Sequence, residues 1–186
     1  LKPKEDEFFR KSRSSLEKFD VFISYRRSNG SNLASLLKIY LEQRGFSVYL
    51  DVVSLQTGQF TENILDTIKE TKNFVLVLSS NALDRCMDDK GCNDWVHREI
   101  AQALQRECNI IPVLDHFQWP DQESLPEDIK AITSFNAVTW IHEYQSNCLD
   151  KIERFIISTE QDGSITTGGH LVTDCEMQSS SKRRSN

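Results

Sequence analysis

A carboxylate and an aromatic ring stand four residues apart in the segment DWVHREI, which begins at Asp94. Trp95 and Glu99 have i, i+4 spacing and therefore project from the same side of a helix. Val96 and Ile100 fall on the apolar stripe of such a helix, and Glu99 lies at the border of that stripe, where partial desolvation is expected. An oriented carboxylate beside an aromatic ring suits catalysis on a bound ligand.

The same pattern also has a purely structural interpretation. A border glutamate can pair with Arg26 or Arg27 while Trp95 covers the edge of the core, and for an isolated pattern this interpretation is favoured about two to one. His97 falls on the exposed side of the helix, so we expect it to be solvated. The residue types alone leave both roles of Glu99 open.

Two arginines follow the first apolar run of the chain. The sequence SYRRSNGS places Tyr25, Arg26 and Arg27 just before a predicted helix, where backbone N–H groups and two guanidinium groups converge. Such a corner suits a phosphate group, although pairing of the arginines with surface carboxylates fits the sequence about equally well. Because Gly30 stands alone and forms no GxGxxG fingerprint, an orthodox Rossmann dinucleotide site is disfavoured.

The segment DVVSLQTGQF, which begins with Asp51 and ends with Phe60, follows the second apolar run. Its Gly58 suits a turn with positive φ. Connections at this end of an α/β sheet usually carry function, so we expect this loop to overhang the site, the alternative being a plain connection.

Other reactive side chains lack a supporting pattern. The five cysteines do not recur at the short CxxC spacing of zinc sites, which favours free thiols in a reducing compartment. His116 and His142 lie in loops without partners at ligand spacing, so no metal site is expected. Ser79 and Ser80 lack the GxSxG motif of a hydrolase nucleophile.

Composition limits the classes of function. The 186 residues, 38% of them hydrophobic, are enough for one ordinary domain. The net charge of -6 argues against nucleic acid as the main partner. No apolar run reaches the roughly 18 residues of a membrane span, and the charged N-terminus lacks a signal core. We therefore expect a cytoplasmic domain and, since the chain opens at Leu1, a piece of a longer protein.

Apolar, β-branched runs alternate with helical patterns along the chain. The runs predict strands at residues 20–25, 46–51, 74–79, 110–115 and 137–140. Apolar spacing predicts helices at residues 32–44, 61–72, 94–105 and 148–157. This alternation predicts a doubly wound α/β domain over residues 19–158, with ligands beyond the carboxyl ends of its strands. We expect residues 1–18 to be a linker or N-terminal extension and residues 159–186, rich in Ser, Thr and Gly, to be a disordered tail.

Taken together, these motifs resemble a TIR domain. The matching segments, within residues 19–158, are DVFISYRRSNG, FSVYLDVVSLQTGQF, FVLVLSSNALDRC, CNDWVHREIAQAL, NIIPVLDHFQWP, LPEDI and IHEYQ. The combination of WVHRE with SYRRS is most similar to the TIR domain of the sterile-alpha-and-armadillo-motif NAD hydrolases, in an invertebrate form. The resemblance implies a flavodoxin-like α/β fold with a five-stranded parallel sheet of order 2-1-3-4-5 and helices on both faces.

The resemblance also implies an activity. Members of this family cleave the nicotinamide–ribose bond of NAD to nicotinamide with ADP-ribose or cyclic ADP-ribose, with base exchange as a companion reaction, in axon degeneration and innate-immune signalling. NAD is then a substrate, and no cofactor is expected. Glu99 matches the catalytic glutamate of the family. One carboxylate can suffice because it stabilises the oxocarbenium character that develops at the ribose, while nicotinamide leaves without needing a proton.

Further residue roles come from the same resemblance. The substrate-binding residues that it implies are Trp95, stacked on nicotinamide, with Tyr25, Arg26, Arg27, Asp51 and Phe60. The residues that it implies for the BB loop and for assembly are Ser54, Gly58, Trp119, His142 and Tyr144. The expected partners are NAD, further copies of the chain and other TIR proteins, because the BB loop of one domain packs against a neighbour. A non-enzymatic adaptor or a nucleotide sensor is the alternative, although adaptors usually carry a proline-glycine BB loop.

Overall fold

The computed structural model of the chain describes residues 19–50 and 60–161. The predictions for Asp51, Ser54, Gly58 and the side chain of Phe60, with those for residues 1–18 and 162–186, lie outside what is described.

Five parallel strands form one sheet of order β2-β1-β3-β4-β5, as the sequence resemblance implied. They are β1 (Val21–Tyr25), β2 (Val48–Leu50), β3 (Asn73–Ser79), β4 (Asn109–Asp115) and β5 (Val138–Thr139). Each overlaps a predicted strand. Because the strand order reverses between β1 and β3, a ligand site is expected beyond the carboxyl ends of these two strands.

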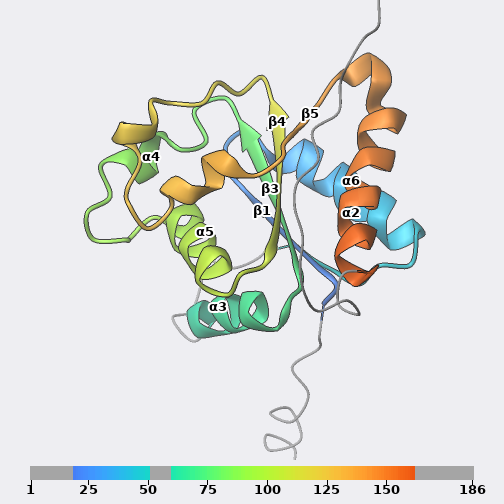
Figure 1. Cartoon of the computed structure of the whole chain (residues 1–186), viewed down its shortest axis with the longest axis horizontal. Helices are drawn as coiled ribbons and strands as arrows, with labels where there is room; N and C mark the ends of the chain where they lie inside the picture. The colour runs from blue at the N-terminus through green and yellow to red at the C-terminus, as the bar shows by residue number, and fades with distance from the viewer. Residues whose placement is uncertain (1–18, 51–59, 162–186) are drawn as a thin grey trace, which may run out of the picture.

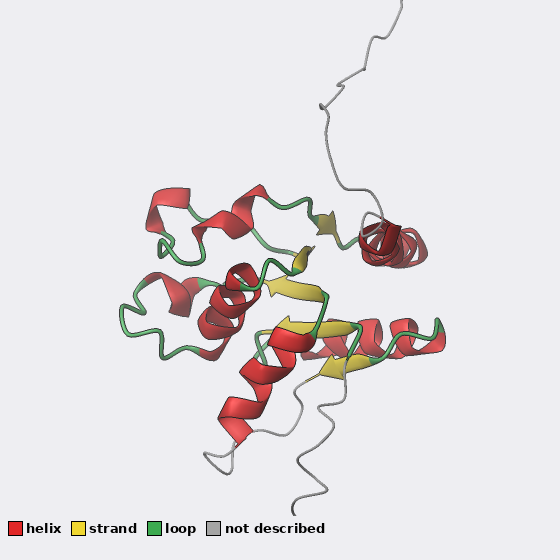
Figure 2. Ribbon diagram, turned by 60° about the horizontal axis from the view of Figure 1, so that its bottom comes forward, coloured by secondary structure: helices red, strands yellow, loops and turns green. Residues whose placement is uncertain are grey.

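Helices cover both faces of the sheet (Figure 1; Figure 2). On one face lie α2 (Ser31–Gln43) and α6 (Gln145–Gln161), and on the other lie α3 (Phe60–Glu70), α4 (Asp84–Met87) and α5 (Trp95–Gln105). The 3-10 segments are η1 (Gln122–Ser124), η2 (Lys130–Ser134) and η3 (His142–Tyr144). The sequence missed α4 and these segments because they are too short to show a helical period.

The last helix differs from its prediction at both ends. It runs from Gln145 to Gln161, whereas the apolar spacing predicted residues 148–157. Residues 159–161, which the sequence assigned to the tail, thus belong to α6. Apolar periodicity fades where a helix extends into solvent, so it underestimates such ends.

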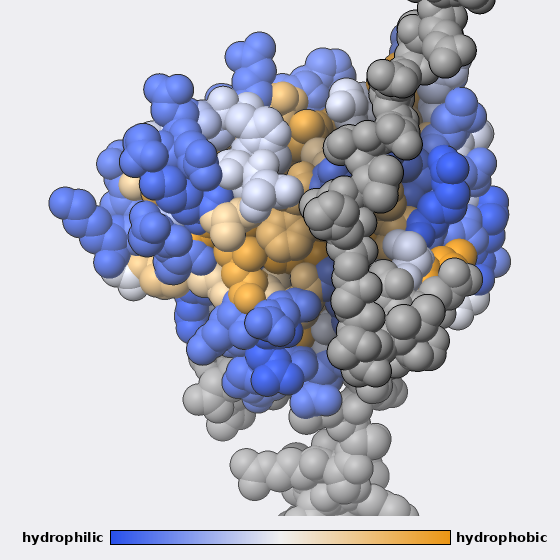
Figure 3. Space-filling view, in the orientation of Figure 1, coloured by the Kyte–Doolittle hydropathy of each residue, from blue (hydrophilic) through white to orange (hydrophobic). Residues whose placement is uncertain are grey.

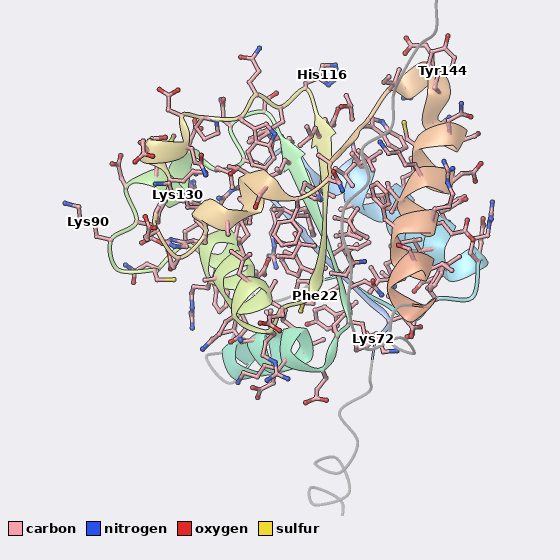
Figure 4. The ribbon with its side chains drawn as sticks, in the orientation of Figure 1. Phe22, Lys72, Lys90, His116, Lys130 and Tyr144 are labelled. Atoms are coloured by element: carbon pink, nitrogen blue, oxygen red, sulfur yellow. The ribbon has the colours of Figure 1, made fainter. Side chains whose placement is uncertain are left out.

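The strand β3 shows why the sheet is buried on both faces. Phe74 and Leu76 pack on the side of α3 and α5, whereas Val75 and Val77 pack on the side of α2 and α6. This alternation follows from the two-residue period of a strand, and every residue of β3 is buried. Phe22 of β1, near the centre of Figure 4, stacks on Phe74 with ring centroids 5.5 Å apart.

The exterior is mostly polar. Figure 3 shows apolar side chains along the middle of one face, with polar side chains on both flanks. Within residues 19–50 and 60–161, no helix combines the length and the apolar character needed to cross a bilayer.

Helix α2 offers a matched test of this core, because Leu37 is fully buried while its neighbour Leu36 is 37% exposed. We expect Leu37→Ala to lower the free energy of unfolding by about 3 kcal/mol, since it removes buried methyl groups and leaves a cavity. Leu36→Ala should cost less than about 1 kcal/mol. Urea unfolding followed by circular dichroism measures both, and equal losses would contradict this placement of α2.

Candidate functional site

A cavity of about 640 Å³ opens beyond the carboxyl ends of β1 and β3. Its walls include Tyr25 at the end of β1, Arg26 and Arg27 after this strand, the start of α4, and Trp95 with Glu99 from α5. In Figure 4, His116 lies at the carboxyl edge of the sheet, after β4, and Lys72 lies at the opposite edge. The volume and position of the cavity suit a nucleotide-sized ligand. The predicted pair on α5 therefore faces a single cavity.

Glu99 is a buried acidic side chain, only 7% exposed. The hydroxyl of Ser24, which is 1% exposed near the end of β1, donates a hydrogen bond of 2.6 Å to Glu99 Oε2. A hydrogen bond of this length is short and fixes the orientation of the Glu99 carboxyl group. Ser24 could not be identified from the sequence, because a lone serine in an apolar strand gives no signal of what its hydroxyl contacts.

Arg26 acts as a clamp between three segments. Its guanidinium donates to both carboxylate oxygens of Asp94, at 2.6 and 3.0 Å, and twice to the carbonyl of Ala82, at 3.0 and 2.7 Å. Burial would lower the pKa of Arg26, but the hydrogen bond and charge of Asp94 outweigh it and raise the pKa. The structural interpretation paired Glu99 with Arg26 or Arg27, and Arg26 forms an ion pair with Asp94.

Asp94 also caps the N-terminus of α5. Its backbone is extended, and its Oδ1 accepts the backbone N–H of His97 at 3.2 Å, which is N-cap geometry. Burial would raise the pKa of Asp94, but the hydrogen bond and charge of Arg26 prevail and hold the pKa of this carboxyl below its usual range. An aspartate just before an apolar helical pattern was the signal that could have identified this cap.

Trp95 is half-buried at the first position of α5. The guanidinium carbon of Arg98 lies 4.6 Å from its ring centroid, a cation–π distance. This contact limits how the indole can turn and presents the ring to the cavity that Glu99 also lines.

Cys86 lies behind the Arg26–Asp94 pair, with its Sγ 3.6 Å from a guanidinium nitrogen and from Asp94 Oδ1. Burial, with the charge of Asp94, raises the pKa of this thiol to about 12. It is therefore protonated at neutral pH and is no nucleophile. The four described cysteines are free thiols, as the sequence predicted for them.

The expectation that His97 is solvated is wrong, because its side chain is only 2% exposed. Its Nδ1 lies 3.2 Å from Asp89 Oδ2, and its Nε2 lies 3.0 Å from Asp128 Oδ1. Segments before α5 and near Asp128 cover the side of the helix that faces away from the sheet. A helical wheel of α5 alone cannot show this cover.

Trp119, His142 and Tyr144 lie apart from the residues that line the cavity within the described part of the chain. The ring of Trp119 packs edge-on against Phe117, with centroids 5.2 Å apart. His142 and Tyr144 lie in η3, and Tyr144 is 63% exposed. Figure 4 shows Tyr144 far from Lys90, on the side of α6.

Three curated relatives cover about three quarters of the chain. The chain is 58% identical over 138 residues to NAD(+) hydrolase sarm1 of Drosophila melanogaster, with 74% of the chain and 10% of the relative aligned. It is 55% identical over 137 residues to NAD(+) hydrolase SARM1 of Danio rerio (74% and 19%) and 47% identical over 142 residues to NAD(+) hydrolase tir-1 of Caenorhabditis elegans (75% and 14%). The chain thus spans less than a fifth of each relative.

Solved structures show the same fold. The TIR domain of the Toll-related receptor TRR-2 of Hydra magnipapillata superposes with a TM-score of 0.51 at 19% identity, over 75% of this chain and 98% of that one. The TIR domains of the activated Roq1 resistosome give 0.55 at 18% identity, over 74% and 99%. A sequence model of the TIR domain matches residues 21–152, more than half of the chain, and the chain therefore belongs to the TIR domain family.

Proposed function

We propose that this domain cleaves the nicotinamide–ribose bond of NAD, with Glu99 as its catalytic carboxylate. The observation that carries the proposal is the buried Glu99 carboxylate, oriented by Ser24 in a cavity of nucleotide size that Trp95 shares. The names of the three curated relatives support the same reaction. NAD is the substrate, and the reaction needs no cofactor.

The residue types fit this chemistry. When the C–N bond breaks, both electrons leave with nicotinamide, which departs as a neutral molecule, and positive charge develops on the ribose. The carboxylate of Glu99 stabilises that charge, and the Ser24 hydrogen bond keeps one of its oxygens in place. Water then adds to the ribose carbon and loses a proton to give ADP-ribose, or a ring nitrogen of the adenine adds to give the cyclic product. Trp95 offers a π face to the cationic nicotinamide ring.

The other end of the cavity suits the phosphates of NAD. Arg27 and the N-terminus of α2, which follows Gly30, lie at the loop after β1. Backbone N–H groups at a helix N-terminus and a guanidinium group both attract phosphate. Arg26, whose guanidinium is committed to Asp94 and Ala82, contributes by shaping this wall.

The proposal includes assembly. Trp119, His142 and Tyr144 lie outside the cavity of their own domain, so they can contribute to NAD binding only in a neighbouring copy. Tyr144 and the adjacent Ile141, 44% exposed, give this surface the aromatic and aliphatic character of an interface. We extend the proposal to contacts with other TIR proteins, a cytoplasmic location and a role in axon degeneration or innate-immune signalling. The domain that we propose to carry these functions spans residues 19–158.

A non-enzymatic adaptor is the competing function. The role of Glu99 distinguishes an adaptor from an NAD-cleaving enzyme. An adaptor has no use for a desolvated carboxylate at the bottom of a cavity, because burying the charge costs free energy. Adaptor function would survive replacement of Glu99, whereas turnover would not.

Glu99→Gln should lower nicotinamide release from NAD at least about 100-fold, because the isosteric amide keeps the contact with Ser24 and loses the charge that stabilises the transition state. The exposed Glu70, at the end of α3, supplies the matched control Glu70→Gln, which should keep the parental rate. Release is followed by chromatography, with circular dichroism to verify the fold. Parental turnover by Glu99→Gln would exclude the proposed catalytic role.

Asp94→Asn should lower the free energy of unfolding by about 3 kcal/mol, because it keeps an N-cap oxygen and leaves the charge of Arg26 unpaired in a mostly buried site. The pKa of Asp94 in the folded state lies below its usual value. The ion pair therefore stabilises the fold fully at pH values above that usual pKa. This contribution is lost as the pH falls through the lowered pKa, and the two proteins should converge there. Asp150→Asn, in an exposed pair with Arg44, should cost less than about 1 kcal/mol. Urea unfolding across acidic pH measures these differences, and a constant difference between parent and Asp94→Asn would rule out the ion pair as its source.

A mixing experiment tests the composite site. Glu99→Gln and Tyr144→Ala should each be inactive alone, and nicotinamide release by the parental chain should rise faster than linearly with protein concentration. In an equal mixture, about a quarter of head-to-tail contacts unite an intact Glu99 with an intact Tyr144 of the neighbour, so about a quarter of the parental rate should return. A Tyr144→Ala protein that is itself active, in a mixture that releases no more nicotinamide than its Tyr144→Ala share, would show that each domain works alone.

A further inference from the structure

A second cluster of polar side chains lies on the other side of α5 from the cavity. His97 stands two positions after Trp95 and two positions before Glu99, and two positions correspond to about 200° of rotation around a helix. Its cluster is therefore distinct from the proposed NAD site. Figure 1 shows the two segments that reach it, the loop between α4 and α5 and the segment that carries η1 and η2, on the same side of the domain.

The imidazole of His97 is held in one orientation. Asp89 Oδ2 lies 3.2 Å from Nδ1, and Asp89 is itself fixed by the backbone N–H groups of Asn93 and Asp94, at 2.9 and 2.7 Å. With Nδ1 fixed by a carboxylate, Nε2 points toward Asp128, 3.0 Å away. Histidine ligands of metal ions are oriented in this way, by a carboxylate behind the ring.

Cys92 completes a set of three donors. Its Sγ, a ring nitrogen of His97 and a carboxylate oxygen of Asp128 all lie within 4.8 Å of one another. Zinc bonds of about 2.0 to 2.3 Å in a tetrahedron place ligand atoms roughly 3.3 to 3.8 Å apart. Small side-chain rotations close the remaining gap, and both outer ligands can make them, because Cys92 is half-buried and the Asp128 side chain is 52% exposed.

An ion can reach this position from solvent. Cys92 and Asp128 lie at the rim of a shallow cavity of about 480 Å³ beside α5. The carboxylates of Asp89 and Asp128 make the position attractive to a cation. Lys90 and Lys130, labelled in Figure 4, lie on the same two segments but are not ligands. Lys130 forms ion pairs with Glu123 and Glu127.

We propose that Cys92, His97 and Asp128 bind a zinc ion, with Asp89 behind the histidine and a water molecule as the fourth ligand. Binding releases the thiol proton of Cys92, and the proton on Nε2 where the ring carries one, to solvent. The ion joins the loop before α5 to the segment around Asp128. It thereby stabilises the N-terminus of the helix that carries Trp95 and Glu99. No sequence pattern indicates this site, because Asp128 lies 31 residues from His97.

The test uses the 186-residue chain, stripped of metal with a chelator, and Co²⁺ as a spectroscopic probe for zinc. One equivalent of Co²⁺ should give the visible bands of tetrahedral coordination together with a near-ultraviolet thiolate band, and Zn²⁺ should displace it. Zn²⁺ at about 100 times its dissociation constant should raise the melting temperature by about 5 to 10 °C. Neither readout depends on NAD cleavage, so the proposed function and this site can fail separately.

Surface variants make the test decisive even if the buried His97 tolerates no change. Cys92→Ser should abolish the thiolate band, and Asp128→Asn should weaken Zn²⁺ binding at least about 10-fold. The matched controls are Glu127→Gln, which removes a neighbouring exposed charge, and His116→Asn, which breaks the exposed pair with Asp115. Both should bind as the parent does. A thiolate band that survives Cys92→Ser, or parental affinity in Asp128→Asn, would overturn the proposal.

Discussion

The ion pair between Arg26 and Asp94 connects the parts of the domain that form the cavity. Arg26 follows β1, Asp94 caps α5, and the carbonyl of Ala82, which shares the guanidinium, belongs to the turn after β3. Taking both charges out of water costs several kcal/mol, and only two-point geometry with additional hydrogen bonds offsets that cost. Because four hydrogen bonds to Asp94 and Ala82 hold the guanidinium, the pair fixes where α5 begins relative to the sheet. The positions of Trp95 and Glu99 follow from that start.

The regular elements could be predicted from the sequence because their signals are local. The β-branched runs and the apolar stripe of α5 each depend on neighbours within a few residues, and the strand order came from the resemblance. The partners of polar side chains could not be predicted, because they come from distant segments. Arg26 and Asp94 are 68 residues apart, and Ser24 and Glu99 are 75 apart. His97 shows the resulting error, since the segment around Asp128 buries a face that the helix alone would expose.

Glu99 is placed where stability alone would not place a glutamate. An exposed carboxylate at this border position would keep its hydration, whereas the native side chain is 7% exposed and relies on a hydroxyl of the sheet. Under the proposed function, a fold that keeps a carboxyl group at the end of a cavity loses some stability and gains an oriented, poorly solvated carboxylate. That property is what stabilisation of a cationic sugar requires, because electrostatic attraction strengthens as water is removed.

Helix α5 can carry the two proposed sites because different residues position its two sides. Its apolar stripe, with Ile100 fully buried, fixes the helix on the sheet, and the cap at Asp94 fixes its start. On the cavity side Ser24 orients Glu99, while the opposite side holds His97 between two carboxylates. Asp89 helps to position both the start of α5 and the ring of His97. Its carboxylate accepts the backbone N–H groups before the helix and also contacts the histidine ring. An ion at His97 would therefore stiffen the same loop that positions Asp94, and rigidity at that loop reaches the cavity through the Arg26 ion pair.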